Sequence, residues 1–338
     1  MQAQGLTVRP ELVDGWTVKS FMVRAFDKLR THHERLNLLP AKKLKNIESA
    51  TYFAALLHLR NFMAYTIIFN CLRHWTAMLE ALAHIVKTAA QEELLPRFAA
   101  AERRFKADGS IVTEADLAMQ QRMAGELAAF SPQYRLLGEE MTGNEQLELL
   151  QNGDTGLWCL DPLDGTSNFA SGIPFFSVSL GLLIDRKPHL GLVYDPIRDE
   201  CFAAIKGRGA TLNGKPLRCA PVGLPLCKTI AVVDFKRLTP QLVGALISRP
   251  PYGSHRNFGS VALEWSWLAA NRFHVYLHGR QMLWDYAAGA LVLAEAGGSM
   301  ENLSGGPVFS LQLQPSSAVA ASDPALFADW KGWLGTQK

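Results

Sequence analysis

Two carboxylates three residues apart are the feature of this sequence best suited to chemistry. They open the segment 161–169, which reads Asp-Pro-Leu-Asp-Gly-Thr-Ser-Asn-Phe. The proline stiffens the backbone between them, because its ring fixes φ near about −65°, and the glycine frees the next turn. The apolar run at 156–160 predicts a buried strand just upstream. Carboxylates at a strand end can hold hard cations, and free N–H groups at a helix start can hold an anion. The segment therefore predicts a site for metal and phosphate.

Two further acidic clusters support this interpretation. Glu139 and Glu140 end a second short predicted strand, and Asp285 stands at the start of an apolar, alanine-rich predicted helix. Each cluster alone has an ordinary explanation, since a Glu-Glu pair is usually a solvated turn and an aspartate often caps a helix. Together with the segment 161–169 they supply the oxygen ligands that magnesium prefers. The sequence shows no cysteine or histidine cluster with the spacing of a zinc site.

These patterns resemble the inositol monophosphatase family of metal-dependent, lithium-sensitive phosphatases. Four ordered motifs carry the resemblance: Lys-Ala-Asp-Gly-Ser-Ile-Val-Thr-Glu-Ala-Asp at 106–116, Gly-Glu-Glu at 138–140, the segment 161–169, and Trp-Asp-x-Ala-Ala-Gly-x(5)-Glu-Ala-Gly-Gly at 284–298. They fall between about Met78 and about Leu334, which is roughly three quarters of the chain. The resemblance implies a magnesium-dependent phosphoric monoester hydrolase that acts on a small phosphorylated polyol.

The resemblance also implies metal ligands. Glu139, Asp161 and the backbone carbonyl of Leu163 are expected to hold a first Mg²⁺ ion. Asp161, Asp164 and Asp285 are expected to hold a second, and Glu139 to reach a weaker third. Two or three ions are therefore expected. Phosphate monoester hydrolysis suits such a site, because paired divalent ions can stabilise both the attacking and the leaving oxygen.

Other residues take catalytic or substrate roles by the same resemblance. Asp116 and Thr166 are expected to orient the water that attacks phosphorus, Glu139 counts among the catalytic residues, and Glu140 is expected to lie behind the ligands. The amides of Gly165 and Thr166 are expected to cradle the phosphate. The predicted contacts with phosphate or substrate are Gly165, Thr166, Ser167, Gly259, Ser260 and His278.

One of these positions departs from the family pattern. Inositol-specific members carry a glutamate six residues before the Trp-Asp motif, where this chain has His278. A glutamate only accepts hydrogen bonds, whereas a neutral histidine offers one donor and one acceptor. His278 and the nearby Arg280 are candidates to attract a second anionic group of the substrate. In the alternative, the loop shifts, His278 faces solvent, and specificity lies at Gly259, Ser260 and Val261.

The order of elements predicts an α+β fold, and the resemblance implies a layered α/β/α/β sandwich of the inositol monophosphatase and fructose-1,6-bisphosphatase type. Two helices come first, the second starting at Thr113 with a buried stripe of Leu117, Met123, Leu127 and Phe130. A strand meander follows, with a hairpin turn at Asn213-Gly214. The last third is predicted to alternate as strand 229–235, helix 260–270, strand 273–277, helix 284–296, strand 317–321 and helix 324–334.

Charge divides the chain unevenly. Residues 1–77 carry 11 lysines and arginines against 5 acidic residues, whereas the remainder carries 23 against 26. We expect residues 1–77 to be a basic extension, either non-native or poorly ordered. We expect a catalytic domain at 78–336, with halves 78–220 and 221–336 and the metal site where they meet. The apolar stretch between Arg60 and Arg73 has 12 residues, too short for the ~20 that span a bilayer.

Several alternatives remain open on sequence alone. The Thr-Ser-Asn-Phe ending resembles the inositol branch, but a 3′(2′),5′-bisphosphate nucleotidase, a histidinol phosphatase and a fructose-1,6-bisphosphatase share the metal motifs. Some bacterial members of the family also join RNA-bound transcription complexes, and the basic extension keeps such a nucleic-acid complex open. A homodimer is expected from the family. Scattered cysteines and the lack of an apolar leader predict a cytoplasmic protein.

Overall fold

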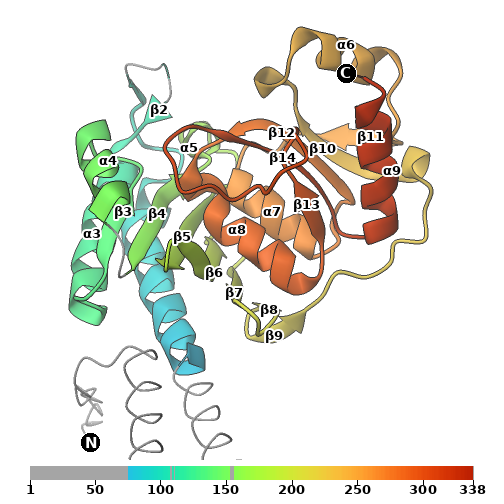
Figure 1. Cartoon of the computed structure of the whole chain (residues 1–338). Coiled ribbons are helices and arrows are strands. Elements are labelled where there is room, and N and C mark those ends of the chain that lie inside the picture. Colours follow the sequence, from blue (N-terminus) through green and yellow to red (C-terminus); the bar gives the residue numbers. More distant parts are fainter. Residues whose placement is uncertain (1–74, 107–108, 110, 153–155, 338) are drawn as a thin grey trace, which may run out of the picture. The chain divides into compact units, whose positions relative to one another are not determined.

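The computed structural model describes residues 75–106, 109, 111–152 and 156–337 (Figure 1). These residues fall within one compact unit, Arg73–Lys338. The predicted extension, apart from residues 75–77, lies outside the described residues. Residues 75–93 are helical. Trp75 is buried, and its ring centroid lies 4.5 Å from that of His189.

The first sheet contains the predicted meander. Its seven strands follow the order β3-β4-β5-β6-β7-β8-β9; β3 pairs parallel with β4, and every later pair is antiparallel. The predicted turn at Asn213 and Gly214 is confirmed, with φ of 50° and 74° that suit a two-residue hairpin. The strands are β3 (Arg135–Gly138), β4 (Leu157–Asp164), β5 (Ser177–Ile184), β6 (Lys187–Asp195), β7 (Glu200–Ile205), β8 (Ala210–Leu212) and β9 (Lys215–Leu217).

The second sheet comes from the last third of the chain. Its five strands follow the order β11-β10-β12-β14-β13, with β10 parallel to both neighbours and β14 antiparallel to both of its own. They are β10 (Ile230–Asp234), β11 (Ser254–Arg256), β12 (Val275–Gln281), β13 (Ser299–Glu301) and β14 (Ser316–Ala321). Because parallel strands end at the same edge, β10 and β12 bring their carboxyl ends side by side.

Helices α7 (Val261–Ala269) and α8 (Leu283–Ala296) form the layer between the two sheets (Figure 1). They share a buried apolar cluster with Phe202 of the first sheet and Val232 of the second. The approach is close, since a Cβ at Gly191 of β6 would lie 2.6 Å from the Ala288 carbonyl oxygen, and one at Gly289 would lie 2.6 Å from the Cβ of Trp265. Glycine at these two points lets α8 lie directly on the strand and on α7.

The outer faces of both sheets are also covered by helices. Helix α3 (Glu114–Phe130) lies along the first sheet, and α6 (Pro240–Ser248) and α9 (Pro324–Gly335) lie beyond the second (Figure 1). Leu246 of α6 and Trp330 of α9 share a core with Val233. The predicted layered sandwich is therefore confirmed, and α6 and α9 add an outer helical layer.

Some local predictions were wrong or missing. Leu117 was predicted to be buried but is 48% exposed, whereas Met123 and Leu127 are buried as expected. Helix α4 (Gly143–Asn152) and helix α6 were not predicted. The remaining short elements are β1 (Arg104–Phe105), β2 (Ile111–Val112), α5 (Thr166–Ala170) and the 3-10 turns η2 (Leu95–Arg97), η3 (Leu226–Lys228) and η4 (Phe235–Arg237). Among the described helices, none is long and apolar enough to cross a bilayer.

The buried Trp75 leads to a test of where the catalytic unit begins. We expect a chain that starts at Leu72 to keep the full-length melting temperature and activity. A chain that starts at Met78 should melt a few degrees lower, because it lacks the Trp75 contact with His189. Trp75→Ala in the full chain should reproduce that drop. Thermal melting of the three proteins checks this, and equal melting temperatures for the two truncations would contradict it.

Candidate active site

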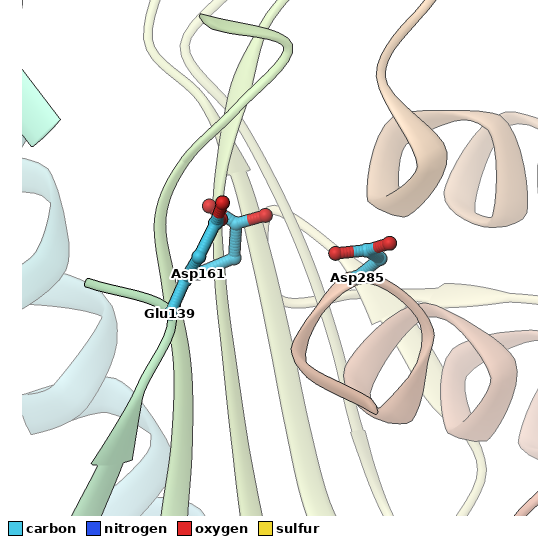
Figure 2. Close-up of side chains that lie close together, drawn as sticks. All are labelled: Glu139, Asp161 and Asp285. Atoms are coloured by element: carbon cyan, nitrogen blue, oxygen red, sulfur yellow. The ribbon is translucent and has the colours of Figure 1, made fainter. Parts of the chain in front are cut away.

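Three carboxylates converge from three elements. Glu139 follows β3, Asp161 lies in β4, and Asp285 lies in the first turn of α8. Their ligand oxygens all lie within 4.8 Å of one another. Figure 2 shows Glu139 and Asp161 side by side, with Asp285 facing them from the start of its helix. The sequence predicted that these residues share a site, and the structure brings them together.

The proline between the paired aspartates alters the strand locally. The pairing of β4 with β5 joins Asp161 to Ser179 and Asp164 to Ser177, so three steps on β4 match two on β5. One extra residue therefore bulges out of β4, where Pro162 could not have donated a ladder hydrogen bond. The Asp161 carboxylate instead accepts the N–H of Leu163 at 3.0 Å.

Burial and mutual repulsion act on these carboxylates together. The pKa values of Asp161 and Asp285 are raised well above their usual range, first by burial and next by the charge of Glu139. Burial also raises the pKa of Asp164 to about 6, against hydrogen bonds that lower it. A crowded set of oxygen donors with no soft ligand fits a hard divalent cation, which would remove the repulsion.

Lys106 is the cation that faces this cluster among the described residues. Its Nζ lies 2.9 Å from Glu139 Oε1 and 2.6 Å from Glu140 Oε1. Burial disfavours the charged lysine, but the two glutamates outweigh it and raise the lysine pKa. Burial raises the pKa of Glu140 to about 7, while Lys106 lowers it. Lys106 is the first residue of the motif at 106–116, but no role was predicted for it from the sequence.

Asp164 ties the first sheet to helix α7. Its carboxylate accepts the Ser260 hydroxyl at 2.5 Å, the N–H of Val261 at 3.0 Å and the N–H of Ala262 at 2.8 Å. Ser260 is fully buried, so its hydroxyl holds Asp164 and does not face solvent as a predicted substrate contact would. Val261 is the single donor to Oδ1, which leaves that oxygen able to take a further partner.

Asp116 and Thr166, the two residues expected to orient the attacking water, lie within hydrogen-bond distance of each other. Thr166 Oγ1 lies 2.9 Å from Asp116 Oδ1 and 3.0 Å from the Leu163 carbonyl oxygen. The other Asp116 oxygen accepts both the N–H and the hydroxyl of Thr113, at 2.7 and 2.6 Å, in a capping box that begins α3. Burial raises the pKa of Asp116, and these hydrogen bonds oppose the rise.

Gly165 and Gly259 bring two loops together beside this pair. Gly165 has φ of +95° at the start of α5, and a Cβ there would lie 3.2 Å from the Gly259 carbonyl oxygen. Asn168 Nδ2 donates to the carbonyls of Phe175 at 2.8 Å and Phe258 at 2.7 Å, which fixes α5 against both segments. Ser167 is exposed in the first turn of α5.

His278 does not face solvent, so the alternative prediction of a solvent-facing His278 is wrong. It lies near the end of β12, is 5% exposed, and places Nε2 3.0 Å from Asp234 Oδ2. Its Nδ1 accepts the N–H of Arg280 at 3.2 Å. Both ring nitrogens are therefore occupied, and the predicted contact with substrate stays a prediction. His278→Glu would place a second carboxylate beside Asp234, so we expect that variant to be less stable.

Two acids behind the site had no role in the sequence analysis: Glu264, which is buried, and Asp234, which is half-buried. Glu264 of α7 accepts the N–H groups of Phe258 and Gly259, each at 3.0 Å, and burial raises its pKa to about 8. A single carboxylate in an otherwise apolar helix was a signal for such a role. Asp234 ends β10, and a strand that ends in a carboxylate was the same signal that identified Asp161.

The repulsion within the cluster predicts that these carboxyl groups stabilise the metal-free protein at low pH and destabilise it at high pH. A carboxyl group whose pKa is raised by folding stabilises the fold at low pH and loses that effect as pH rises. In EDTA we therefore expect Asp161→Asn to melt at least ~2 °C above the wild type at pH 8. The difference should disappear near pH 4, and Asp329→Asn, at an exposed position of α9, should change little. A melting temperature that falls in Asp161→Asn at pH 8 would contradict the repulsion.

Known proteins match most of the described chain. The profile of the inositol monophosphatase family matches residues 72–330. Inositol monophosphatase 1 of Solanum lycopersicum is 36% identical over 231 residues, covering 65% of this chain and 81% of that protein. Nus factor SuhB of Escherichia coli strain K12 is 33% identical over 219 residues, covering 63% and 79%.

Solved structures agree with these matches. IMPase-II of Staphylococcus aureus with bound 2′AMP has a TM-score of 0.64 and 26% identity, covering 76% of this chain and 93% of that one. The same enzyme with bound inositol monophosphate has a TM-score of 0.61 and 25% identity, covering 75% and 93%. The protein therefore belongs to the inositol monophosphatase family and is a phosphoric monoester hydrolase.

Proposed function

We propose that this protein is a magnesium-dependent phosphatase that hydrolyses a small phosphorylated polyol. The observation that carries the proposal is the convergence of Glu139, Asp161 and Asp285, whose oxygens lie within 4.8 Å of one another. Magnesium prefers such oxygen ligands and keeps part of its water shell. When bound, the ions would supply positive charge to the phosphate oxygens and to the oxygens that attack and leave.

The proposed metal ligands come from the family resemblance, and the convergence of Glu139, Asp161 and Asp285 supports them. Glu139, Asp161 and the Leu163 carbonyl would hold one ion, and Asp161, Asp164 and Asp285 a second. Glu139 would also reach a third, weaker ion. Asp164 is suited to bind the second ion because, among the described residues, Val261 alone donates a hydrogen bond to its Oδ1 atom. Lys106 would balance the charge of Glu139 and Glu140.

Asp116 and Thr166 would position the attacking water. The Asp116 carboxylate holds the Thr166 hydroxyl at 2.9 Å, so the proton of that hydroxyl points at Asp116 or at the Leu163 carbonyl. The oxygen of Thr166 keeps a lone pair that can accept a hydrogen bond from a water molecule. Asp116 is itself fixed by two hydrogen bonds from Thr113, which keeps the hydroxyl in one orientation.

The start of α5 would bind the phosphate. The first intrahelical donor is the N–H of Phe169, which bonds the Gly165 carbonyl, so the earlier amides have no partner within the helix. Gly165 and Thr166 would offer these N–H groups, and exposed Ser167 would contribute its hydroxyl. Gly259 would contact the substrate from the neighbouring loop.

The substrate class rests on relatives. One solved relative contains inositol monophosphate and another state of it contains 2′AMP. These two ligands share a phosphate monoester on a hydroxylated ring, which supports a phosphorylated polyol or nucleotide here. A 3′(2′),5′-bisphosphate nucleotide, histidinol phosphate and fructose 1,6-bisphosphate are the rival substrates. Phosphate release from a panel of these esters decides between them.

A second role is an accessory function in an RNA-bound transcription complex. It is supported by relatives that carry the name Nus factor SuhB, one of them 33% identical to this chain. Asp161→Asn separates the two roles, because it removes a proposed metal ligand and leaves the molecular surface almost unchanged. If the variant restores a deletion strain without restoring phosphatase activity, the accessory role is the one that the cell needs.

A homodimer and a cytoplasmic location complete the proposal. Family members supply the expectation of a dimer, and light scattering on the purified chain tests it. The described cysteines Cys159, Cys201, Cys219 and Cys227 are free thiols, as is usual in a reducing compartment. Cell fractionation tests the location.

Activity should require the ions. We expect hydrolysis to stop in excess EDTA and to return with Mg²⁺, lithium to inhibit, and Ca²⁺ to compete without supporting turnover. Asp161→Asn, Asp164→Asn and Asp285→Asn should each lower kcat by about 100-fold or more while the fold persists by circular dichroism. Asp329→Asn is the control and should keep full activity. Undiminished turnover in EDTA would overturn the metal-dependent mechanism.

Thr166 should act on the rate more than on substrate binding. Thr166→Ala removes the hydroxyl but keeps the backbone amide, so we expect kcat to fall by about 10- to 100-fold with a small change in KM. Thr166→Ser should recover most of the rate because it restores the hydroxyl. Steady-state kinetics of the three proteins decide it, and a change confined to KM would point to phosphate binding instead.

A further inference from the structure

A basic turn lies beside the acidic cluster, at the carboxyl ends of β10 and β12. The turn is η4, which carries the exposed residues Lys236 and Arg237. Across from it, Arg280 is exposed at the next-to-last position of β12. Helix α8, whose first turn holds Asp285, begins two residues after the last β12 residue, Gln281. Arg237 is close enough to Asp285 for its charge to lower the Asp285 pKa, against the larger effects of burial and Glu139.

The position of this turn is fixed by the backbone. A Cβ atom at Gly279 of β12 would collide with the carbonyl oxygen of Arg237, so the strand and the turn touch without an intervening side chain. Asp234 caps the turn by accepting the N–H of Lys236 at 2.9 Å. The guanidinium of Arg237 therefore projects from a rigid support.

The Arg237 side chain itself is available to a ligand. Its side chain is 46% exposed, and its nearest anionic partner is Asp234, at 3.9 Å from Nε. That carboxylate already accepts the Lys236 amide and lies 3.0 Å from His278 Nε2. No described residue accepts a hydrogen bond from the Arg237 guanidinium. At 3.9 Å the pair is too long for a hydrogen bond, so Arg237 could turn to a ligand without breaking one.

These observations assign a binding role to Arg237, on the assumption that the proposed phosphatase function is correct. We propose that Arg237 binds a second anionic group of the substrate, a carboxylate or a second phosphate, while the phosphate to be cleaved lies at the carboxylate cluster. A guanidinium matches either oxyanion with two parallel hydrogen bonds. Glu139, Asp161, Asp164 and Asp285 would otherwise repel such a group, so this cationic edge would define its place.

The test uses pairs of substrates that differ only in the second anion. Glycerol 2-phosphate and 2-phosphoglycerate differ by a carboxylate, and glucose 6-phosphate and glucose 1,6-bisphosphate differ by a phosphate. We expect wild-type protein with Mg²⁺ to prefer the member with the second anionic group in at least one pair. Arg237→Gln should reduce that preference in kcat/KM by about 10-fold, mainly through KM. Arg237→Lys should lose less of that preference, because lysine keeps the positive charge although it cannot donate two parallel hydrogen bonds.

The matched control is Arg135→Gln at the opposite end of β3 from Glu139. Arg135 is similarly exposed, at 52%, and makes a similarly loose ion pair, 3.4 Å from Glu148. It should leave the preference unchanged. If Arg237→Gln lowers both members of each pair equally, or neither, the assignment to Arg237 is wrong while the phosphatase function stands. If wild-type protein hydrolyses no member of either pair, the proposed function fails and the role of Arg237 fails with it.

Discussion

Like charges held at close range are the constraint on which this structure depends. Folding buries Asp161 and half-buries Asp285 beside Glu139, and the pKa of each is raised first by loss of solvent and next by the charge of Glu139. Burying carboxylates costs free energy unless donors or cations compensate. Backbone N–H groups of Leu163 and Met282 and the ammonium of Lys106 supply part of the compensation. The remainder is what a divalent cation would provide, so binding and stability are coupled here.

The hydrogen bonds that offset these charges also connect the first sheet to α7, in the helical layer between the two sheets. Asp164, at the end of β4, accepts both the hydroxyl of Ser260 and the first free amides of α7. Glu264, one turn into α7, accepts the amides of Phe258 and Gly259. The loop before α7 is thus held from both ends by carboxylates. A site assembled in this way is sensitive to the packing of α7 and α8 between the sheets, because that packing sets the distance from Asp285 to Asp161.

The contacts of His278 show how the residue type at one position determines the structure at the edge of the site. A histidine at this position donates to or accepts from its neighbours, and here it lies 3.0 Å from Asp234. Burial raises the Asp234 pKa, but the hydrogen bond and charge of His278 outweigh burial and lower it overall. The carboxylate therefore stays ionised and caps η4, the turn that carries Arg237. A glutamate at 278 would face that carboxylate, so this end of β12 would have to be built differently.

Local patterns in the sequence were enough to predict the layered fold, the meander and the carboxylate set. Strand alternation, helix caps such as Thr113 and the Asn213-Gly214 turn are encoded within a few residues, and Asp161, Asp164 and Asp285 stand in dense motifs. What only the tertiary structure decided were partners far apart in the chain: Lys106 with Glu139, Ser260 with Asp164, and His278 with Asp234. Those pairings depend on which strands lie side by side and on how closely backbones approach, as at Gly279. Strand register and helix packing set these distances, and no local spacing carries that information.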